Sequence, residues 1–174
     1  MGLFATLPLA GGMITALPSH PDRDLWYDSL KKPPLTAPKK VFAPAWTILY
    51  VAMGYAAYRV ERSPLAVSRR ALTWFGAQLA LNYAWTPLFF HCRQKGAAVL
   101  ECAALGFAVC KTTSYFASID ELAGRLMLPY LAWVAYAGYV SAGVWWLNGG
   151  GDEARSLEER AKREAQEMNR RLHH

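Results

Sequence analysis

Apolar residues in this chain come in long blocks rather than at alternating positions. Four blocks contain no charged residue and cover 2–19, 41–58, 71–90 and 126–147, while a fifth, 96–118, contains only Glu101 and Lys111. A helix that crosses a membrane needs about 20 mostly apolar residues. The pattern therefore predicts five membrane-spanning helices, and the fold class is an all-α membrane bundle.

Other interpretations of these blocks fit less well. A soluble bundle with five nearly uncharged helices would have too little polar surface, and a membrane β-barrel would show short alternating segments. Residues 2–19 also lack the basic segment that opens a signal peptide, because the first Lys or Arg is Arg23. We interpret 2–19 as the first span.

Charge is segregated as strongly as hydropathy. The chain is 53% hydrophobic with a mean hydropathy of +0.06, and its net charge is +6. The side of the membrane with the first and third loops and the C-terminus has 13 Lys/Arg, against five on the other side. Such an excess marks the cytoplasmic face. We expect the first loop and the tail to be cytosolic, and the charge to reflect topology rather than nucleic-acid binding.

The chain divides into two parts. Residues 1–148 form the predicted five-helix membrane domain, and 149–174 form a Gly-rich joint followed by a charged tail. Pairs such as Glu158–Lys162 and Glu159–Arg163 favour a helix in the tail, because opposite charges four residues apart stabilise helices. The tail helix is interpreted either as solvated or as a partner-binding element.

Polar and aromatic residues within the spans fall on one face of each predicted helix. They are Trp46 and Tyr50 on the second span, Gln78, Asn82, Trp85 and Phe89 on the third, and Tyr130, Trp133 and Ala137 on the fifth. Asn and Gln are costly toward lipid, so these faces should point inward and find partners. They predict either a pocket for a flat apolar ligand or an ordinary aromatic core.

Other residue patterns give no sign of soluble-type enzyme chemistry. No hydrolase triad, phosphate-binding glycine loop, HExxH motif or metal-ligand spacing occurs. We expect no catalytic residue, no bound metal and no required cofactor, and small buried roles for the three cysteines. Glu101 and Lys111 lie about 15 Å apart along a helix axis, so each needs its own partner. The stripe of Gly76, Ala80 and Ala84 predicts close helix contacts.

Several stretches in order resemble the translocator protein family, which includes the peripheral benzodiazepine receptor and bacterial tryptophan-rich sensory proteins. They are WYDSLKKP from residue 26, FAPAWTILYVAMGYAAY from 42, GAQLALNYAWTPLFF from 76 and LPYLAWVAYA from 128. The resemblance implies a five-helix membrane protein, often a homodimer. It also implies binding of tetrapyrroles (protoporphyrin IX or haem) and benzodiazepine-site drugs, and of cholesterol in eukaryotic members. The mitochondrial outer membrane is implied for a eukaryotic source, with the endoplasmic reticulum or a bacterial membrane as alternatives.

The resemblance also assigns residues. The implied ligand-binding set is Trp46, Tyr50, Asn82, Trp85, Trp133 and Ala137, and the implied loop lid is Trp26, Leu30, Lys31, Lys32 and Pro33. In this family the first loop folds over the mouth of the pocket, where its lysines could meet porphyrin propionates. Prolines stiffen such a loop and reduce the entropy lost on ordering.

This chain departs from the family pattern in three places. Pro34–Pro38 has no aromatic lid residue, a family tryptophan early in the fourth span is Ala97, and no basic residue follows Tyr139 until Arg155. The last departure removes the expected cholesterol pattern, so tetrapyrrole binding is better supported than cholesterol binding. A ligand-binding receptor or carrier is the leading interpretation. A porphyrin-degrading membrane enzyme and a partner-binding scaffold are the alternatives.

Overall fold

The computed structural model describes residues 21–150, together with Pro8, Arg163, Gln166, Met168 and Arg170. Between 21 and 150 it consists of helices α2 (Pro21–Ser29), α3 (Lys39–Glu61), α4 (Leu65–Thr86), α5 (Lys95–Ile119) and α6 (Glu121–Leu147), without any strand in that range. A π-helical segment, η1 (Pro87–His91), continues α4. The predicted spans 41–58, 71–90, 96–118 and 126–147 are thus confirmed as helical. The predicted span 2–19 and most of the tail lie outside the described residues.

Two of these helices are long and apolar enough to cross a membrane. They are α3, with 23 residues, and α5, with 25 residues, and each contains a window of mean hydropathy 1.3. The all-helical fold class is confirmed for the described residues, whereas the count of five membrane spans stays a prediction.

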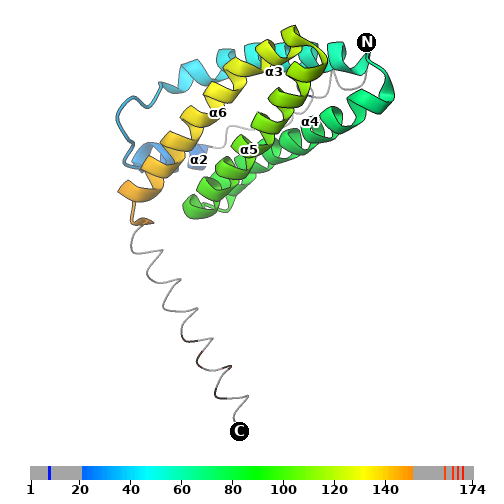
Figure 1. Cartoon of the computed structure of the whole chain (residues 1–174). Coiled ribbons are helices and arrows are strands. Elements are labelled where there is room, and N and C mark those ends of the chain that lie inside the picture. The colour runs from blue at the N-terminus through cyan, green and yellow to red at the C-terminus, as the bar shows by residue number, and fades with distance from the viewer. Residues whose placement is uncertain are drawn as a thin grey trace.

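The long helices α3, α4, α5 and α6 pack side by side (Figure 1). Asp120 alone separates α5 from α6, and its carboxylate caps α6 by accepting the Ala123 N–H at 2.8 Å. The same carboxylate accepts two hydrogen bonds from Arg59 of α3, at 2.7 and 2.9 Å. Near this turn a Cβ on Gly124 would lie 2.5 Å from the Ala117 Cβ. We call this tightly joined region the closed end.

The opposite end of the bundle is covered by α2 and the segment 30–38, which together we call the lid. The sequence predicted an irregular loop here, but Pro21–Ser29 is helical, consistent with Pro at its first position and aspartates in its first turn. Beneath the lid, the Cys92 N–H bonds the Pro87 carbonyl at 3.0 Å and forms the wide turn of η1. Such π-turns are frequent at functional sites. This one places Phe89 and Phe90 under the lid.

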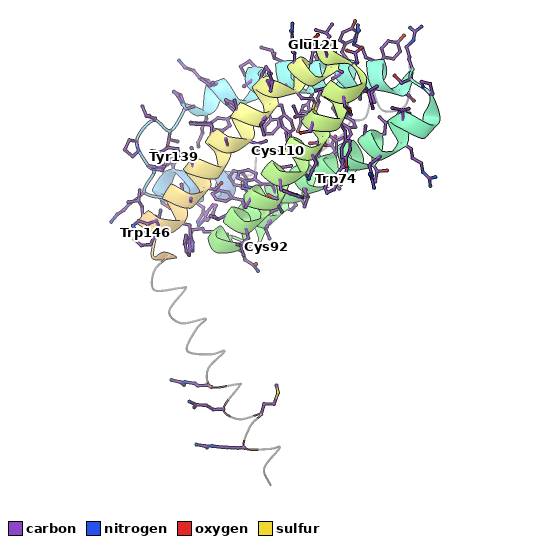
Figure 2. All side chains as sticks on the ribbon, viewed as in Figure 1. Trp74, Cys92, Cys110, Glu121, Tyr139 and Trp146 are labelled. Carbon is purple, nitrogen blue, oxygen red and sulfur yellow. The ribbon has the colours of Figure 1, made fainter. Side chains whose placement is uncertain are left out.

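Two expectations about small residues are wrong within the described chain. Ala80 and Ala84 are exposed and a Cβ on Gly76 would meet nothing within 4 Å, so this stripe lies on the outer face of α4. The close helix contact is made at Gly124 instead. The cysteines are not uniformly buried either, because only Cys102 is, and all three are free thiols. Figure 2 shows Cys92 near the end of η1 and Cys110 along α5.

Candidate functional site

An aromatic cluster lies in the middle of the bundle, and we call its members Trp46, Tyr50, Tyr130 and Trp133 the aromatic floor. The Trp46 ring stacks on Tyr50 with centroids 5.2 Å apart. It also meets Tyr130 and Trp133 edge-on, at 6.1 and 6.3 Å. Edge-to-face and offset-stacked pairs at such distances are the favoured aromatic geometries. Two helices that are distant in sequence, α3 and α6, therefore build one surface.

Polar side chains of α4 reach the aromatic floor. The Tyr50 hydroxyl donates to Asn82 Oδ1 at 2.9 Å, and the Tyr130 hydroxyl donates to Gln78 Oε1 at 2.9 Å. Gln78 is fully buried and Asn82 nearly so. The predicted inward orientation of Gln78 and Asn82 is confirmed, and the oxygen of each amide has a tyrosine partner.

Trp85 belongs to a second cluster, in which Trp26 and Tyr27 of the lid pack against Trp85, Phe89 and Phe90 of the bundle. Trp85 stacks on Phe89 with centroids 5.0 Å apart and planes at 9°. Trp26 of α2 packs edge-on against Phe89 at 5.6 Å. The predicted ligand set is thus divided between two aromatic layers. Ala137 is half-buried on α6, one turn beyond Trp133.

Several buried polar atoms in this interior have no hydrogen-bond partner. They are Gln78 Nε2, Trp85 Nε1 and both carboxylate oxygens of Glu101. Glu101 lies within electrostatic range of Tyr130, and Cys102, its chain neighbour, contacts Ser141 at 3.7 Å. Lys111, the other charge within the spans, lies over the Phe107 ring at 5.5 Å. Two unpaired donors on α4 and an unpaired carboxylate on α5 are therefore buried within the bundle.

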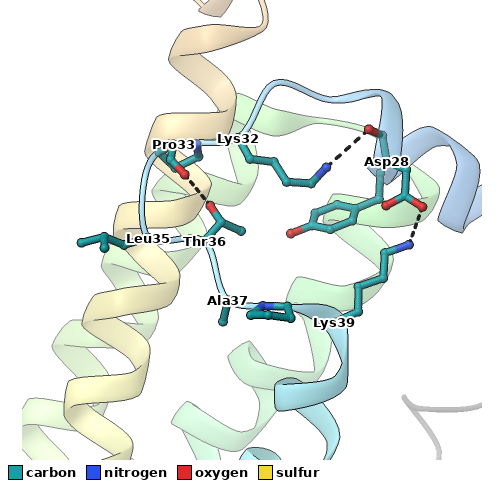
Figure 3. Close-up of a pocket in the computed structure, with 9 residues that line it drawn as sticks. Asp28, Lys32, Pro33, Leu35, Thr36, Ala37 and Lys39 are labelled. Atoms are coloured by element: carbon teal, nitrogen blue, oxygen red, sulfur yellow. Dashed lines mark hydrogen bonds and ion pairs between the residues drawn. The ribbon is translucent and has the colours of Figure 1, made fainter.

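The lid has a hollow of about 440 Å³ on its own surface (Figure 3). Its walls include Tyr27, Asp28, Lys32, Thr36 and Lys39. Lys39 pairs with Asp28 at 2.8 Å, while Lys32 lies 4.6 Å from the Tyr27 ring centroid and points at backbone carbonyls. Burial, then Tyr136 and Asp28, raises the pKa of the Tyr27 phenol, which therefore stays neutral at physiological pH.

The remaining predicted lid residues have distinct surroundings. Leu30 packs with the Phe89 cluster, Pro33 is buried, and the Lys31 side chain is exposed. Sequence reasoning missed Tyr136, Tyr139 and Asn148, whose side chains bond the backbone of 31–37. Of these three residues, only Asn148 has a feature in the nearby sequence that indicates a special role. It lies at the end of α6, just before the glycine triplet.

A second hollow, of about 360 Å³, lies between α5 and α6. Small and apolar side chains line it, among them Cys102, Gly106, Val134 and Gly138. Neither hollow is lined by Trp46, Asn82 or Trp133. The prediction that these three face one cavity stays a prediction, although the structure brings them into the same layer.

The fold and interior define a class: a helical membrane protein with an aromatic and amide-lined interior beneath a basic lid. The chain matches the TspO/MBR family over residues 4–147 and belongs to that family. It is 38% identical to the translocator protein of Bos taurus over 145 residues, covering 82% of this chain and 86% of the relative. It is also 36% identical to the human translocator protein over 159 residues, covering 90% and 94%.

Bacterial relatives are equally similar. The tryptophan-rich sensory protein of Cereibacter sphaeroides is 37% identical over 154 residues, which cover 88% of this chain and 96% of the relative. The CrtK protein of Rhodobacter capsulatus is 39% identical over 129 residues, covering 72% and 79%. The resemblance found in the sequence is therefore confirmed at the level of the family.

Proposed function

We propose that this chain is a membrane receptor or carrier that binds tetrapyrroles, such as protoporphyrin IX or haem, and related flat apolar ligands between the lid and the aromatic floor. The observation that carries the proposal is the group of buried, unpaired polar atoms at Gln78, Trp85 and Glu101. A buried polar group without a partner costs about 1–3 kcal/mol. A ligand with polar atoms at its edges would remove that cost.

The surroundings of these atoms suit a flat ligand. The stacked rings of Trp46 and Tyr50 below, and of Trp85 and Phe89 above, offer extended aromatic faces. A tetrapyrrole adds acidic propionates, and the lid contains two neighbouring cations, the exposed Lys31 and the half-buried Lys32. Lysine and aromatic contacts together favour a ligand that is apolar over its face and anionic at one edge.

Trp85→Phe gives the cleanest test, because it removes the unpaired indole N–H and keeps an aromatic ring. We expect protoporphyrin IX to bind this variant about two- to tenfold more weakly, the loss of one hydrogen bond. Its affinity is measured by the porphyrin's absorbance shift in nanodiscs. Trp74→Phe is the matched control, since Trp74 is on the same helix but packs against Phe107 instead. Equal affinity in both variants would remove Trp85 from the site.

The lid lysines are tested with a ligand pair. Protoporphyrin IX and its dimethyl ester have the same ring, but only the acid carries propionates. Exposed ion pairs contribute about 0.2–1 kcal/mol each and are screened by salt. The acid should lose affinity at high salt, and Lys31→Gln/Lys32→Gln should flatten that dependence without affecting the ester. If the affinities of the acid and the ester respond alike to salt, the lysines do not bind the propionates and serve only to orient the chain in the membrane.

The same titration separates binding from turnover. We propose binding without chemical change, so protoporphyrin IX should be recovered intact after illumination and prolonged incubation. Conversion that depends on Trp46 or Trp133 would favour the porphyrin-degrading alternative. Cholesterol is a weaker candidate, because Tyr139, which would be the central tyrosine of its pattern, bonds the lid at Pro34. A neutral benzodiazepine-site drug is the reference ligand for contacts that do not involve propionates.

Two further proposals concern the assembly. We propose that the lid and the tail face the cytosol, in the mitochondrial outer membrane if the source is eukaryotic. Protease treatment of sealed membranes tests this, since a protected tail would reverse the orientation.

We also propose a homodimer, with the lipid bilayer and the tetrapyrrole as the other partners. The outward stripe of Gly76, Ala80 and Ala84 supports it by allowing close approach. Cross-linking that is unaffected by Gly76→Leu would place the dimer contact elsewhere.

A further inference from the structure

The lid segment 31–37 is bound to α6 by side chains that contact its backbone. Tyr136, Tyr139 and Asn148, all on or at the end of α6, provide these contacts. The partners on the lid are peptide N–H and C=O groups rather than side chains. The attachment therefore depends on the lid's backbone path and on the three α6 residues.

Asn148 holds the first residue of this segment as another peptide group would. Its Oδ1 accepts the Lys31 N–H at 3.0 Å, and its Nδ2 donates to the Lys31 carbonyl at 2.8 Å. The same Nδ2 donates to the Val144 carbonyl at 2.7 Å, which satisfies a free carbonyl at the end of α6. Only an amide side chain can both donate and accept in this way. An aspartate of the same size would lose the donor half.

The two tyrosines bind the tip of the lid. The Tyr139 hydroxyl donates to the Pro34 carbonyl at 2.9 Å. The Tyr136 hydroxyl donates to the Leu35 carbonyl at 3.1 Å and accepts the Ala37 N–H at 2.7 Å. The Tyr136 ring also lies 5.4 Å from Trp133 of the aromatic floor. Tyr136 thus touches the lid with its hydroxyl and the floor with its ring.

The shape of α6 fits the lid closely at one further point. A Cβ on Gly143 would lie 2.5 Å from Pro33 Cγ, so the glycine leaves the space that Pro33 occupies. The lid tip is nevertheless strained, because Leu35 has a φ of 64°. Its side chain is exposed, so packing of that side chain does not offset the strain. A non-glycine residue in this left-handed region costs free energy that surrounding contacts must offset. The hydrogen bonds from Tyr136 and Tyr139 are the contacts next to that strained residue.

We infer that Tyr136, Tyr139 and Asn148 form a latch that keeps the lid closed over the interior, and that Tyr136 is the positioning residue linking the lid to the aromatic floor. The inference rests on the proposed function only in taking the interior as the ligand site. The latch itself is a statement about the lid and α6. Releasing it should expose the backbone of 31–37 without loosening the rest of the bundle.

Limited trypsin digestion in nanodiscs tests the latch without any ligand. Trypsin can cut after Lys31, whereas the bond between Lys32 and Pro33 resists it. Tyr136→Phe/Tyr139→Phe keeps both rings and removes the hydroxyls, so we expect cleavage after Lys31 to be about tenfold faster or more. Cleavage after Arg62, at the closed end, is the internal control and should not change. Unchanged cleavage after Lys31 would overturn the latch.

Two more variants define the mechanism. Tyr115→Phe, which removes a hydroxyl on α5 away from the lid, should behave as the wild type. Asn148→Asp should speed cleavage after Lys31, because it loses both bonds donated by the amide, and Asn148→Ala should speed it further. If Asn148→Asp and Asn148→Ala both match the wild type, the amide is not part of the latch.

A ligand arm separates this inference from the proposed function. Protoporphyrin IX should dissociate faster from Tyr136→Phe/Tyr139→Phe than from the wild type, in parallel with the faster cleavage. Faster cleavage with no porphyrin binding to any variant would support the latch and overturn the tetrapyrrole proposal. Faster cleavage with unaltered porphyrin dissociation would overturn the lid's role as the gate of the site.

Discussion

The closed end and the lid end of this bundle are held by different kinds of contact. At the closed end, the long helices contact one another directly. Arg59 of α3 bonds Asp120 at the turn before α6, and the backbone of α6 at Gly124 lies against Ala117 of α5. At the lid end, side chains such as Tyr136 hold a strained backbone segment. The first arrangement cannot be loosened without separating helices, whereas the second can open while the helices stay packed. The difference indicates one fixed end and one end built to move.

The sharpest way to break this comparison is to force the closed end apart. Gly124→Val should lower the free energy of unfolding by about 3 kcal/mol, because its Cβ would overlap Ala117 backbone and side chain. Gly138→Val is the matched control on α6, since a Cβ there meets nothing within 4 Å among the described residues. Thermal unfolding in detergent measures both. Equal losses would mean that the closed end is no tighter than the part of α6 that borders the second hollow.

A second test concerns the layer between the two ends. Asn82→Leu leaves the Tyr50 hydroxyl buried without its acceptor, so we expect a loss of about 1–3 kcal/mol in stability. The same substitution should weaken a carbonyl-bearing ligand by up to about tenfold. Tyr50→Phe/Asn82→Leu removes both partners and should be more stable than Asn82→Leu alone. A double variant as unstable as the sum of the two single variants would mean that the pair does not interact.

The ion pair between Arg59 and Asp120 at the closed end predicts that stability depends on pH. Hydrogen bonds from Arg59, then from the Ala123 N–H, hold the pKa of Asp120 below its ordinary value. A carboxyl whose pKa is lower in the folded state adds stability above its unfolded pKa, and that stability disappears as the pH falls through the folded value. The melting temperature of the wild type should therefore exceed that of Asp120→Asn at pH 5–7, and the gap should close below about pH 4.

The control for this titration is Glu121→Gln. Glu121 is exposed and pairs only with Arg125 one turn away, so its replacement should leave the pH profile unchanged. Equal melting temperatures of wild type and Asp120→Asn at pH 5–7 would show that the carboxylate acts only as a helix cap, a role that Asn also fills.

The sequence predicted the parts of the molecule that depend on local periodicity. Four helices, and the inward face containing Gln78 and Asn82, follow from the length of apolar blocks and from the 3.6-residue repeat. The same analysis of helix faces singled out Trp46 and Trp133, which the family pattern also matches, and the structure places these two rings in contact.

The lid end could not be predicted in the same way, because its contacts join residues that are 99 to 117 positions apart. Nothing near Lys31 indicates that Asn148 will hold its backbone, and nothing near Tyr136 indicates a bond to Leu35. The short helix α2 was missed because its apolar residues are few. The stripe at Gly76 was misassigned because small residues mark close contacts without showing whether the partner is in the same chain.

The smallest expected effect comes from the strain at the lid tip, and it sharpens the comparison most. Leu35→Gly should relieve a left-handed residue worth about 1–2 kcal/mol, but glycine adds about 0.5–1 kcal/mol of backbone entropy to be lost. The closed lid should therefore gain at most about 1.5 kcal/mol, and cleavage after Lys31 should slow by up to about tenfold. Leu35→Ala is the control, because it removes the exposed side chain and keeps the strain at φ of 64°. Leu35→Gly should also partly offset Tyr136→Phe, since less strain then remains for the latch to hold. If Leu35→Gly and Leu35→Ala are cut at the same rate, strain at residue 35 does not oppose closure of the lid. The lid end would then have no greater tendency to open than the closed end.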